Sequence, residues 1–426
     1  MTIILFLASL IGGIVIGVPI AFSLLFSGIM LMLYLDVFNA QILSQNLFNG
    51  ADSFSMMAIP FFVVAGDLMN RGGLTNKIVD VATSIVGHIR GGLGYVAILA
   101  ILLFASLVGS AVASTAALGA ILIPMMVRSG YNRDRSTALI AGGNILSPIM
   151  PPSVPMIIFG VTAGVSVTDL FMGGIAPAIY ITAILCVVWA LVSRKDSAAP
   201  LPRKSFREVI SAVRKAIWAI FMPVGILLGL RSGMFTPTEA GVMAVVYALL
   251  IGVFVYRELT LQDIKESMIS SAKASSAIMF LAAAAMVSSW LMTIGNIPRI
   301  VTDLLQPFIE HPMVLMLVIA GLVLLVGTSM DVVPTILILT PVLMPAVKQA
   351  GINPVYFGVV FIITCVMGLL TPPVGTVLNV AASTGRINME RIVKAIWPFL
   401  LAIVITLLLL IIFPSLLIQP LEFFTQ

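Results

Sequence analysis

The residues best suited to chemistry lie where two long apolar stretches are broken by paired prolines, Pro151–Pro152 and Pro372–Pro373. Proline lacks a backbone N–H and clashes with the carbonyl one turn earlier, so each pair leaves carbonyl oxygens unpaired. Several such oxygens together can hold a compact cation such as Na⁺, and the ends of the interrupted helices favour an anion or a cation through their dipoles. Prolines that only kink packed helices are the alternative interpretation. Because both breaks occur at matching points of the chain, we expect a binding site.

Two further apolar runs, 93–125 and 313–345, carry small and polar residues at their middle. Asp331 is the most informative of these, since a carboxylate at the centre of a bilayer costs about 2.5–3.5 kcal/mol on insertion scales and usually faces a cavity or a partner. It could line the site, help to hold a cation, or cap the helix that follows it. Ser110 and Ser114 offer hydroxyls in the first run, although helix packing by small residues is an equal alternative.

The composition indicates a polytopic membrane protein. Of the 426 residues, 60% are hydrophobic and 9% are charged, whereas an average soluble domain has about 25% charged residues. Only helices and closed barrels satisfy their backbone groups in lipid. Stretches such as Phe399–Phe413 are apolar on every face, which favours helices over the alternating pattern of a barrel. Seven of the 22 Lys and Arg residues fall between Arg194 and Lys215, which places this segment in the cytoplasm and argues against nucleic-acid binding.

Several residues recur at one constant offset, and together they indicate an internal duplication. The matched pairs are Pro124 and Pro345, Gly130 and Gly351, Asn132 and Asn353, and Pro151–Pro152 and Pro372–Pro373. A basic segment between the copies predicts two inverted repeats. We therefore expect an all-α protein with a first repeat at 1–193, a cytoplasmic basic loop at 194–215 and a second repeat at 216–426.

Each repeat is expected to hold a re-entrant hairpin followed by a proline-broken helix. The hairpins are predicted at 93–125 and 313–345, and the broken helices at 136–163 and 355–384. Basic residues flank both ends of the first run, so re-entry from one face fits the cytoplasmic preference of Lys and Arg better than a crossing does. Met1–Leu35 is predicted to form two short spans that turn near Gly17-Val18-Pro19.

The sequence lacks the motifs of common enzymes and ATP-driven pumps. It contains no His-Glu-x-x-His metal motif, no Gly-x-x-x-x-Gly-Lys-Ser/Thr phosphate loop and no Gly-x-Ser-x-Gly nucleophile turn. Cys186 and Cys365 lie in apolar stretches and are interpreted as core residues. We therefore expect secondary transport driven by an ion gradient rather than enzymatic activity. A membrane-embedded enzyme or an inert scaffold is the alternative from another class.

Several motifs resemble the large membrane subunit of TRAP (tripartite ATP-independent periplasmic) transporters, and the resemblance covers essentially the full length. The motifs are Gly109-Ser110-Ala111-Val112-Ala113-Ser114-Thr115-Ala116-Ala117, Ile123-Pro124, Gly130-Tyr131, Pro151-Pro152-Ser153, Phe171–Pro177, Gly233–Ala240 and Thr371–Gly375. Some members of that family carry an acidic residue at the position of Ser114.

The resemblance implies sodium-coupled import of a small organic acid, such as a C4-dicarboxylate, sialic acid or a sugar-derived keto acid. Transport would occur by an elevator motion of a transport domain against a scaffold, with the amphipathic stretches Thr75–Arg90 and Pro298–His311 as connecting arms. It also implies a multi-pass protein of the bacterial inner membrane, with a small four-helix membrane subunit and an extracytoplasmic substrate-binding protein as partners. A stand-alone sodium–anion symporter of related architecture is the alternative.

The family pattern further implies two Na⁺ sites, formed mostly by backbone carbonyl oxygens. The first would involve Ala105, Val108, Gly109, Ser110, Ser147, Met150 and Pro152. The second would involve Gly327, Met330, Gly368, Thr371 and Val374. The organic acid is expected between the two hairpins, near Ser110, Ser114, Asn144, Ser153, Asp331 and Thr376.

Overall fold

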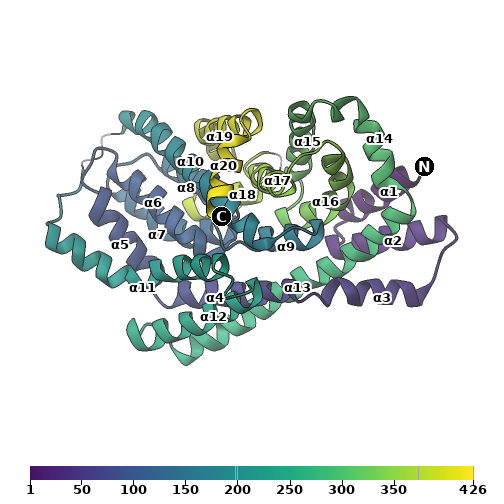
Figure 1. Cartoon of the computed structure of the whole chain (residues 1–426). Helices are drawn as coiled ribbons and strands as arrows, with labels where there is room; N and C mark the ends of the chain where they lie inside the picture. Colours follow the sequence, from purple (N-terminus) through teal and green to yellow (C-terminus); the bar gives the residue numbers. More distant parts are fainter. Residues whose placement is uncertain (197, 199, 373, 426) are drawn as a thin grey trace.

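The computed structural model describes residues 1–196, 198, 200–372 and 374–425. Within them every regular element is helical, which confirms the all-α fold (Figure 1). Among these residues, seven helices are long and apolar enough to cross a membrane, or eight if Ala40–Ala51 and Ser55–Arg71, bent by 54°, count as one span.

The first half of the chain runs from α1 to α10. Its helices are α1 (Thr2–Val15), α2 (Ile20–Tyr34), α3 (Ala40–Ala51), α4 (Ala58–Arg71), α5 (Leu74–Val86), α6 (Gly92–Val108), α7 (Ala111–Arg128), α8 (Arg133–Gly143), α9 (Val154–Ala163) and α10 (Val167–Val192). Short 3₁₀ turns at Ser55–Met57, Asn144–Leu146 and Ser193–Lys195 join some of them.

The second half runs from α11 to α20. Its helices are α11 (Phe206–Arg231), α12 (Pro237–Leu250), α13 (Leu261–Ile294), α14 (Ile297–Ile309), α15 (Pro312–Gly327), α16 (Val332–Gln349), α17 (Pro354–Gly368), α18 (Thr376–Gly385), α19 (Met389–Ile412) and α20 (Ser415–Thr425). A π-helical turn at Ile251–Val255 extends α12.

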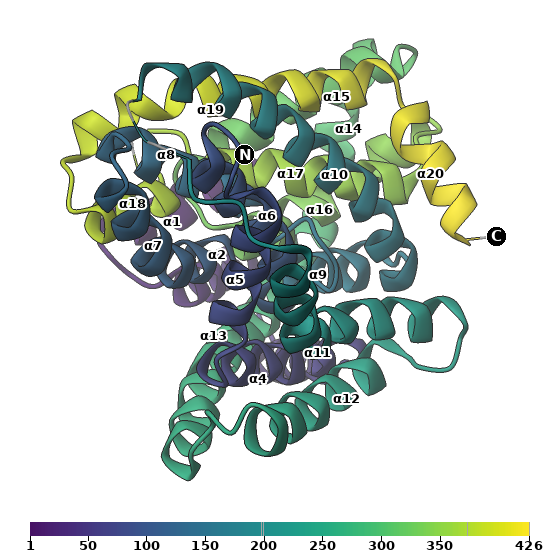
Figure 2. The ribbon, with the colours of Figure 1, turned by 90° about the vertical axis from the view of Figure 1, so that its left-hand side faces the viewer.

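The helices form two layers. In the lower layer of Figures 1 and 2, the 34-residue helix α13 packs against α2, α3 and α4, and α4 packs against α12. Above it lie the helix pairs α6–α7 and α15–α16 together with α8, α9, α17 and α18. The helices α10 and α19 pack on one another at the far side of that upper layer. Contacts between α13 and α16 and between α4 and α9 join the layers.

Residues that match between the two halves have the same local role. Asn132 and Asn353 are the N-caps of α8 and α17, and each Oδ1 accepts hydrogen bonds from two backbone N–H groups at 2.8–3.2 Å. Just before them, Gly130 and Gly351 have positive φ angles of 93° and 67°, which glycine adopts without a steric penalty. An internal duplication would explain why matching residues have the same cap and the same turn in both halves.

Several element boundaries differ from those predicted from the sequence. The segment expected as a loop at 194–215 is shorter, because α11 already begins at Phe206. Ser205 and Glu208 form a capping box there, with each side chain bonded to the other residue's backbone, and this stabilises a helix start in spite of the surrounding charges. Met1–Leu35 contains the two helices α1 and α2, separated at Ile16–Pro19. The helices α3 and α20 were not predicted.

Candidate substrate and cation site

Four irregular segments interrupt the upper layer. The first tip joins α6 to α7 at Gly109–Ser110, and the second tip joins α15 to α16 at Thr328–Asp331. The first break separates α8 from α9 at Ser147–Ser153, and the second break separates α17 from α18 at Leu369–Gly375. Pro373 of the second break lies outside the described residues.

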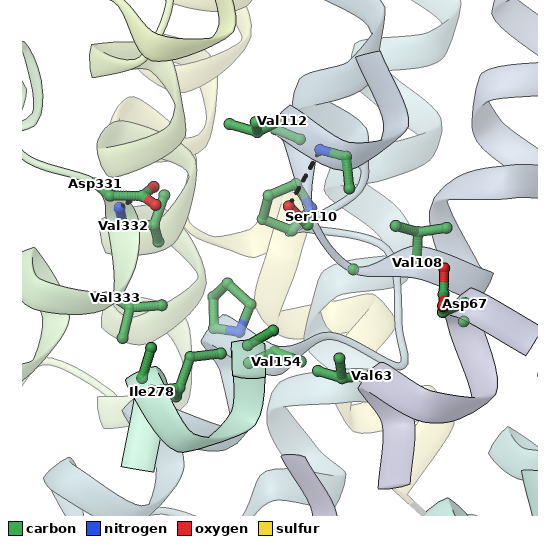
Figure 3. A pocket seen from close by; sticks show the side chains of 18 of the residues that line it. Val63, Asp67, Val108, Ser110, Val112, Val154, Ile278, Asp331, Val332 and Val333 are labelled. Atoms are coloured by element: carbon green, nitrogen blue, oxygen red, sulfur yellow. Dashed lines mark hydrogen bonds between the residues drawn. The ribbon is translucent and has the colours of Figure 1, made fainter. Parts of the chain in front are cut away.

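Both tips open onto one cavity of about 560 Å³ (Figure 3). One wall comes from α4 and α13 of the lower layer, and the other comes from the tips and the start of α9. Ser110 and Asp331 both line it, and the carboxylate of Asp331 points toward the side that carries Ser110. The offset that relates Pro151 to Pro372 also relates Ser110 to Asp331, so equivalent positions of the two halves meet at this cavity.

Three helices begin at the cavity. The first-turn residues Ala111–Ala113 of α7, Val154–Pro155 of α9 and Val332–Pro334 of α16 line it. The N–H groups of a first helical turn have no partner inside the helix, and the helix dipole places partial positive charge there. Neither α7 nor α9 has an acidic residue in its first turn. The N-terminus of α16 is already capped by the carboxylate of Asp331. The first turns of α7 and α9 are therefore the part of the cavity that is suited to an anion.

The first tip lies directly against the first break. A Cβ atom on Gly109 would be 3.4 Å from the nitrogen of Val154 and 3.6 Å from the carbonyl oxygen of Pro152. The carbonyl oxygens of Met150 and Pro152 accept no hydrogen bond from the residues that the structure describes. Oxygens of this kind, next to a tip with left-handed backbone at Gly109, are what a small cation requires of a protein.

A buried hydrogen bond supports this contact. The hydroxyl of Ser147 in the first break donates to Ser114 Oγ on α7 at 2.7 Å, and both side chains are fully buried. Ser110 itself caps α7, since its Oγ accepts from the N–H of Ala113 at 3.4 Å. Ala105 is engaged in its own helix end, where its carbonyl accepts from Gly109 N–H, and Val108 lines the cavity.

The second tip and the second break are in contact where two glycines, Gly327 and Gly368, lie side by side. A Cβ atom on Gly368 would lie 2.5–2.8 Å from backbone atoms of Gly327, so the ends of α15 and α17 touch. Thr371 turns back on α17, with its N–H bonded to the carbonyl of Gly368 and its Oγ1 donating to the carbonyl of Met367 at 2.9 Å. The remaining residues expected at the second Na⁺ site lie on the same two segments, Met330 in the tip and Val374 in the break.

Only part of the set expected around the organic acid lines the cavity. Ser110 and Asp331 line it, and Asp331 also caps α16 through a 2.7 Å hydrogen bond from Val332 N–H. The others are not among its lining residues. Ser114 is bonded to Ser147, Ser153 donates to the carbonyl of Pro148, Asn144 donates to that of Ile140, and Thr376 Oγ1 is buried without a partner among the described residues.

The opposite wall carries polar residues that the sequence analysis did not single out. Asp67 and Asn70 of α4 and Ser270 and Ser271 of α13 line the cavity. Asp67 accepts a hydrogen bond from Ser270 at 2.9 Å, although 203 positions separate the two in sequence. The sequence does contain a signal for this wall, because Asp67 lies in an otherwise apolar stretch. A carboxylate there costs free energy in a membrane, as Asp331 does.

An all-helical chain with several candidate membrane spans, and with broken helices around a cavity, has the architecture of a membrane transporter. The chain belongs to the TRAP transporter family as its large permease component: the family described as "Tripartite ATP-independent periplasmic transporter, DctM component" matches residues 7–416. It is thus a multi-pass protein of the bacterial inner membrane, and its relatives are transporter permeases, not enzymes.

Individual comparisons agree with this membership. The chain is 49% identical to the 2,3-diketo-L-gulonate TRAP transporter large permease protein YiaN of Escherichia coli (strain K12), over 99% of both chains. It is 35% identical to the sialic acid TRAP transporter large permease protein SiaM of Vibrio cholerae, over 94% of this chain and 93% of that one. The solved YdaH transporter of Alcanivorax borkumensis shares the fold alone, with a TM-score of 0.62, 14% identity, and coverage of 88% and 87%.

Proposed function

We propose that this chain is the permease subunit that carries a small organic acid inward across the membrane together with Na⁺. The cargo class includes C4-dicarboxylates, sialic acid and sugar-derived keto acids. The relatives named above are described as transporting 2,3-diketo-L-gulonate and sialic acid, and both compounds fit this class. The Na⁺ ions would occupy the two tip-to-break contacts, and the acid would occupy the cavity between the tips.

The observation that carries this proposal is the meeting of the N-termini of α7 and α9 at one cavity (Figure 3). Partial positive charge from α7 and α9 converges there, whereas the N-terminus of α16 is already capped by the carboxylate of Asp331. A carboxylate can therefore be held by backbone N–H groups and by Ser110, and it leaves again more easily than it would from a buried ion pair.

Sodium coupling is supported by the contacts behind the tips. Each tip rests on a break, and at the first of them the carbonyl oxygens of Met150 and Pro152 have no hydrogen-bond donor among the described residues. A cation bound there would hold Gly109–Ser110 in place, because the same backbone segment shapes the cavity and faces the break. Binding of the ion and of the acid would then favour one another.

The proposed assembly has two partners, a small four-helix membrane subunit and an extracytoplasmic substrate-binding protein. Family membership supports this assembly, since the family description is a tripartite transporter. A chain that works without a binding protein would instead be a stand-alone symporter, for which the likeness to the YdaH transporter supports only the fold.

Reconstitution separates these two functions. The chain and its small membrane subunit are placed in liposomes with Na⁺ present, and a radiolabelled organic acid is supplied either free or on its loaded binding protein. We expect uptake only when the loaded binding protein is present. Equal uptake of the free acid would overturn the partner requirement and favour the stand-alone symporter.

A further inference from the structure

The wall opposite the tips has its own chemistry. It presents Asp67 and Asn70 from α4 and Ser270 and Ser271 from α13 to the same cavity that the tips line. These are hydrogen-bonding side chains on the lower layer, and Figure 3 shows Asp67 on a different element from both Ser110 and Asp331. We refer to Asp67, Asn70, Ser270 and Ser271 as the polar wall.

The polar wall has hydrogen-bonding capacity that the protein does not use. Asp67 binds Arg71 and Ser270 through Oδ2, and no hydrogen bond to its Oδ1 occurs among the described residues. Asn70 accepts a hydrogen bond from Thr75 through Oδ1, at 2.9 Å, and its Nδ2 group donates to no acceptor among the described residues. The hydroxyl of Ser271, a residue only 1% exposed, has no partner among the described residues. Donors and acceptors are thus both present.

The polar wall carries one carboxylate, that of Asp67, and the guanidinium beside it is shared with two other carboxylates. Arg71 lies 3.2 Å from Asp67 and 2.8 Å from Glu266, and 4.0 Å from Asp263. One guanidinium is therefore shared by three carboxylates and cannot neutralise all of them. A second carboxylate of a ligand would meet repulsion at this wall, whereas an alcohol hydroxyl could donate to Asp67 and accept from Asn70.

We propose that the cargo is a polyhydroxylated monocarboxylic acid, with its carboxylate at the first turns of α7 and α9 and its hydroxyl chain against the polar wall. The inference rests on the proposed transport function and narrows its substrate class by excluding C4-dicarboxylates. The cavity of about 560 Å³ lies within the range of about 300–1,000 Å³ that small-molecule sites occupy. Asp331, at the second tip, supplies a further acceptor for a hydroxyl.

The test measures binding without the binding protein, because that protein would impose its own selectivity. Ala274 lines the cavity one turn from the polar wall, and Ala274→Cys places a thiol there. The rate at which a charged thiol reagent labels this variant, together with the small membrane subunit in detergent and Na⁺, is measured with D-gluconate or with succinate. The unsubstituted chain gives the background from Cys186 and Cys365, which are partly and fully buried.

We expect gluconate to slow the labelling and succinate at the same concentration to leave it unchanged. Asn70→Leu should raise the gluconate concentration for half protection about tenfold, since a ligand hydroxyl loses its partner. Asn46→Leu is the matched control, because the side chain of Asn46 bonds, among the described residues, only to the carbonyl of Ile42 in its own helix. Asp67→Asn should let succinate protect, since the repelling charge is gone.

Three results would overturn the inference: equal protection by succinate, no protection by either acid, or the same effect for Asn70→Leu and Asn46→Leu. The uptake assay with the loaded binding protein is independent of this readout. If uptake occurs and gluconate does not protect, the polar wall hypothesis is wrong and the transport function stands. If gluconate protects but uptake fails, the transport function is wrong.

Discussion

At the residue scale, the hydrogen bond between Ser147 and Ser114 connects the first break to α7. Both side chains are fully buried, and the 2.7 Å separation of their oxygens is typical of a strong hydroxyl pair. Ser114 is therefore placed behind the tip rather than among the residues that line the cavity. Its expected role in holding the organic acid stays a prediction, and support of the first tip is the role that its contact indicates.

Ser147→Ala should destabilise the chain and weaken its response to Na⁺. The substitution leaves the Ser114 hydroxyl buried without a partner, at a cost of about 1–3 kcal/mol. The measurements are the unfolding temperature of the purified protein and the Na⁺ concentration for half-maximal uptake. Ser276→Ala is the control, because Ser276 is exposed and bonds to its own helix. Equal unfolding temperatures for the two variants would contradict this role.

Some residues that line the cavity could be predicted from the sequence one by one, and others could not. Asp331 was identified because a carboxylate in an apolar run is costly, and the structure places it at the cavity. Asp67 carries the same signal, but Arg71 lies four residues later and makes it resemble an ordinary helix-surface ion pair. Ser270 could not be found at all, since its relation to Asp67 depends on packing between α4 and α13.

At the element scale, the contact between α15 and α17 depends on two glycines. Gly327 and Gly368 allow the backbones of the second tip and second break to touch, with no room for a side chain on Gly368. This close approach is what the expected second Na⁺ site requires, because carbonyl oxygens from both segments must reach one ion.

Gly368→Ala should therefore separate these two elements. The added methyl group meets the backbone of Gly327, which cannot move aside as a flexible side chain would, and overpacking of this kind costs about 1–3 kcal/mol. We expect a lower unfolding temperature and a loss of Na⁺ activation of uptake. Gly321→Ala on α15 is the matched control, since no atom of the part of the chain that the structure describes lies within 4 Å of the added Cβ. Identical sodium dependence in both variants would argue against a cation site at this contact.

The long apolar helices were predicted, whereas the polar helix α3, the short helix α20 and the capped start of α11 were not. The helix α3 has no clear apolar pattern, because it contains five polar residues: Gln41, Ser44, Gln45, Asn46 and Asn49. Its packing against α13 stabilises it. The start of α11 lies among basic residues that suggested a loop, although the capping box of Ser205 and Glu208 was present in the sequence. The apolar pattern alone does not show whether such a cap stabilises a helix start among so many charged residues.

At the scale of the whole molecule, two layers enclose the cavity from opposite sides. The tips, breaks and helix N-termini belong to the upper layer, and the polar wall belongs to the lower layer (Figures 1 and 3). An elevator motion of one layer against the other, and the inverted relation of the two repeats, stay predictions. If the layers do move in this way, an ion bound between a tip and its break would affect how the acid is held between the layers.

The most direct test of the account is whether a Na⁺ gradient drives accumulation. The chain and its small membrane subunit are reconstituted, the loaded binding protein is added, and the labelled acid inside the liposomes is followed over time. The account predicts accumulation above the external concentration under an inward Na⁺ gradient, and its loss when a sodium ionophore collapses that gradient. Equal accumulation with K⁺ in place of Na⁺, or with the gradient collapsed, would contradict it.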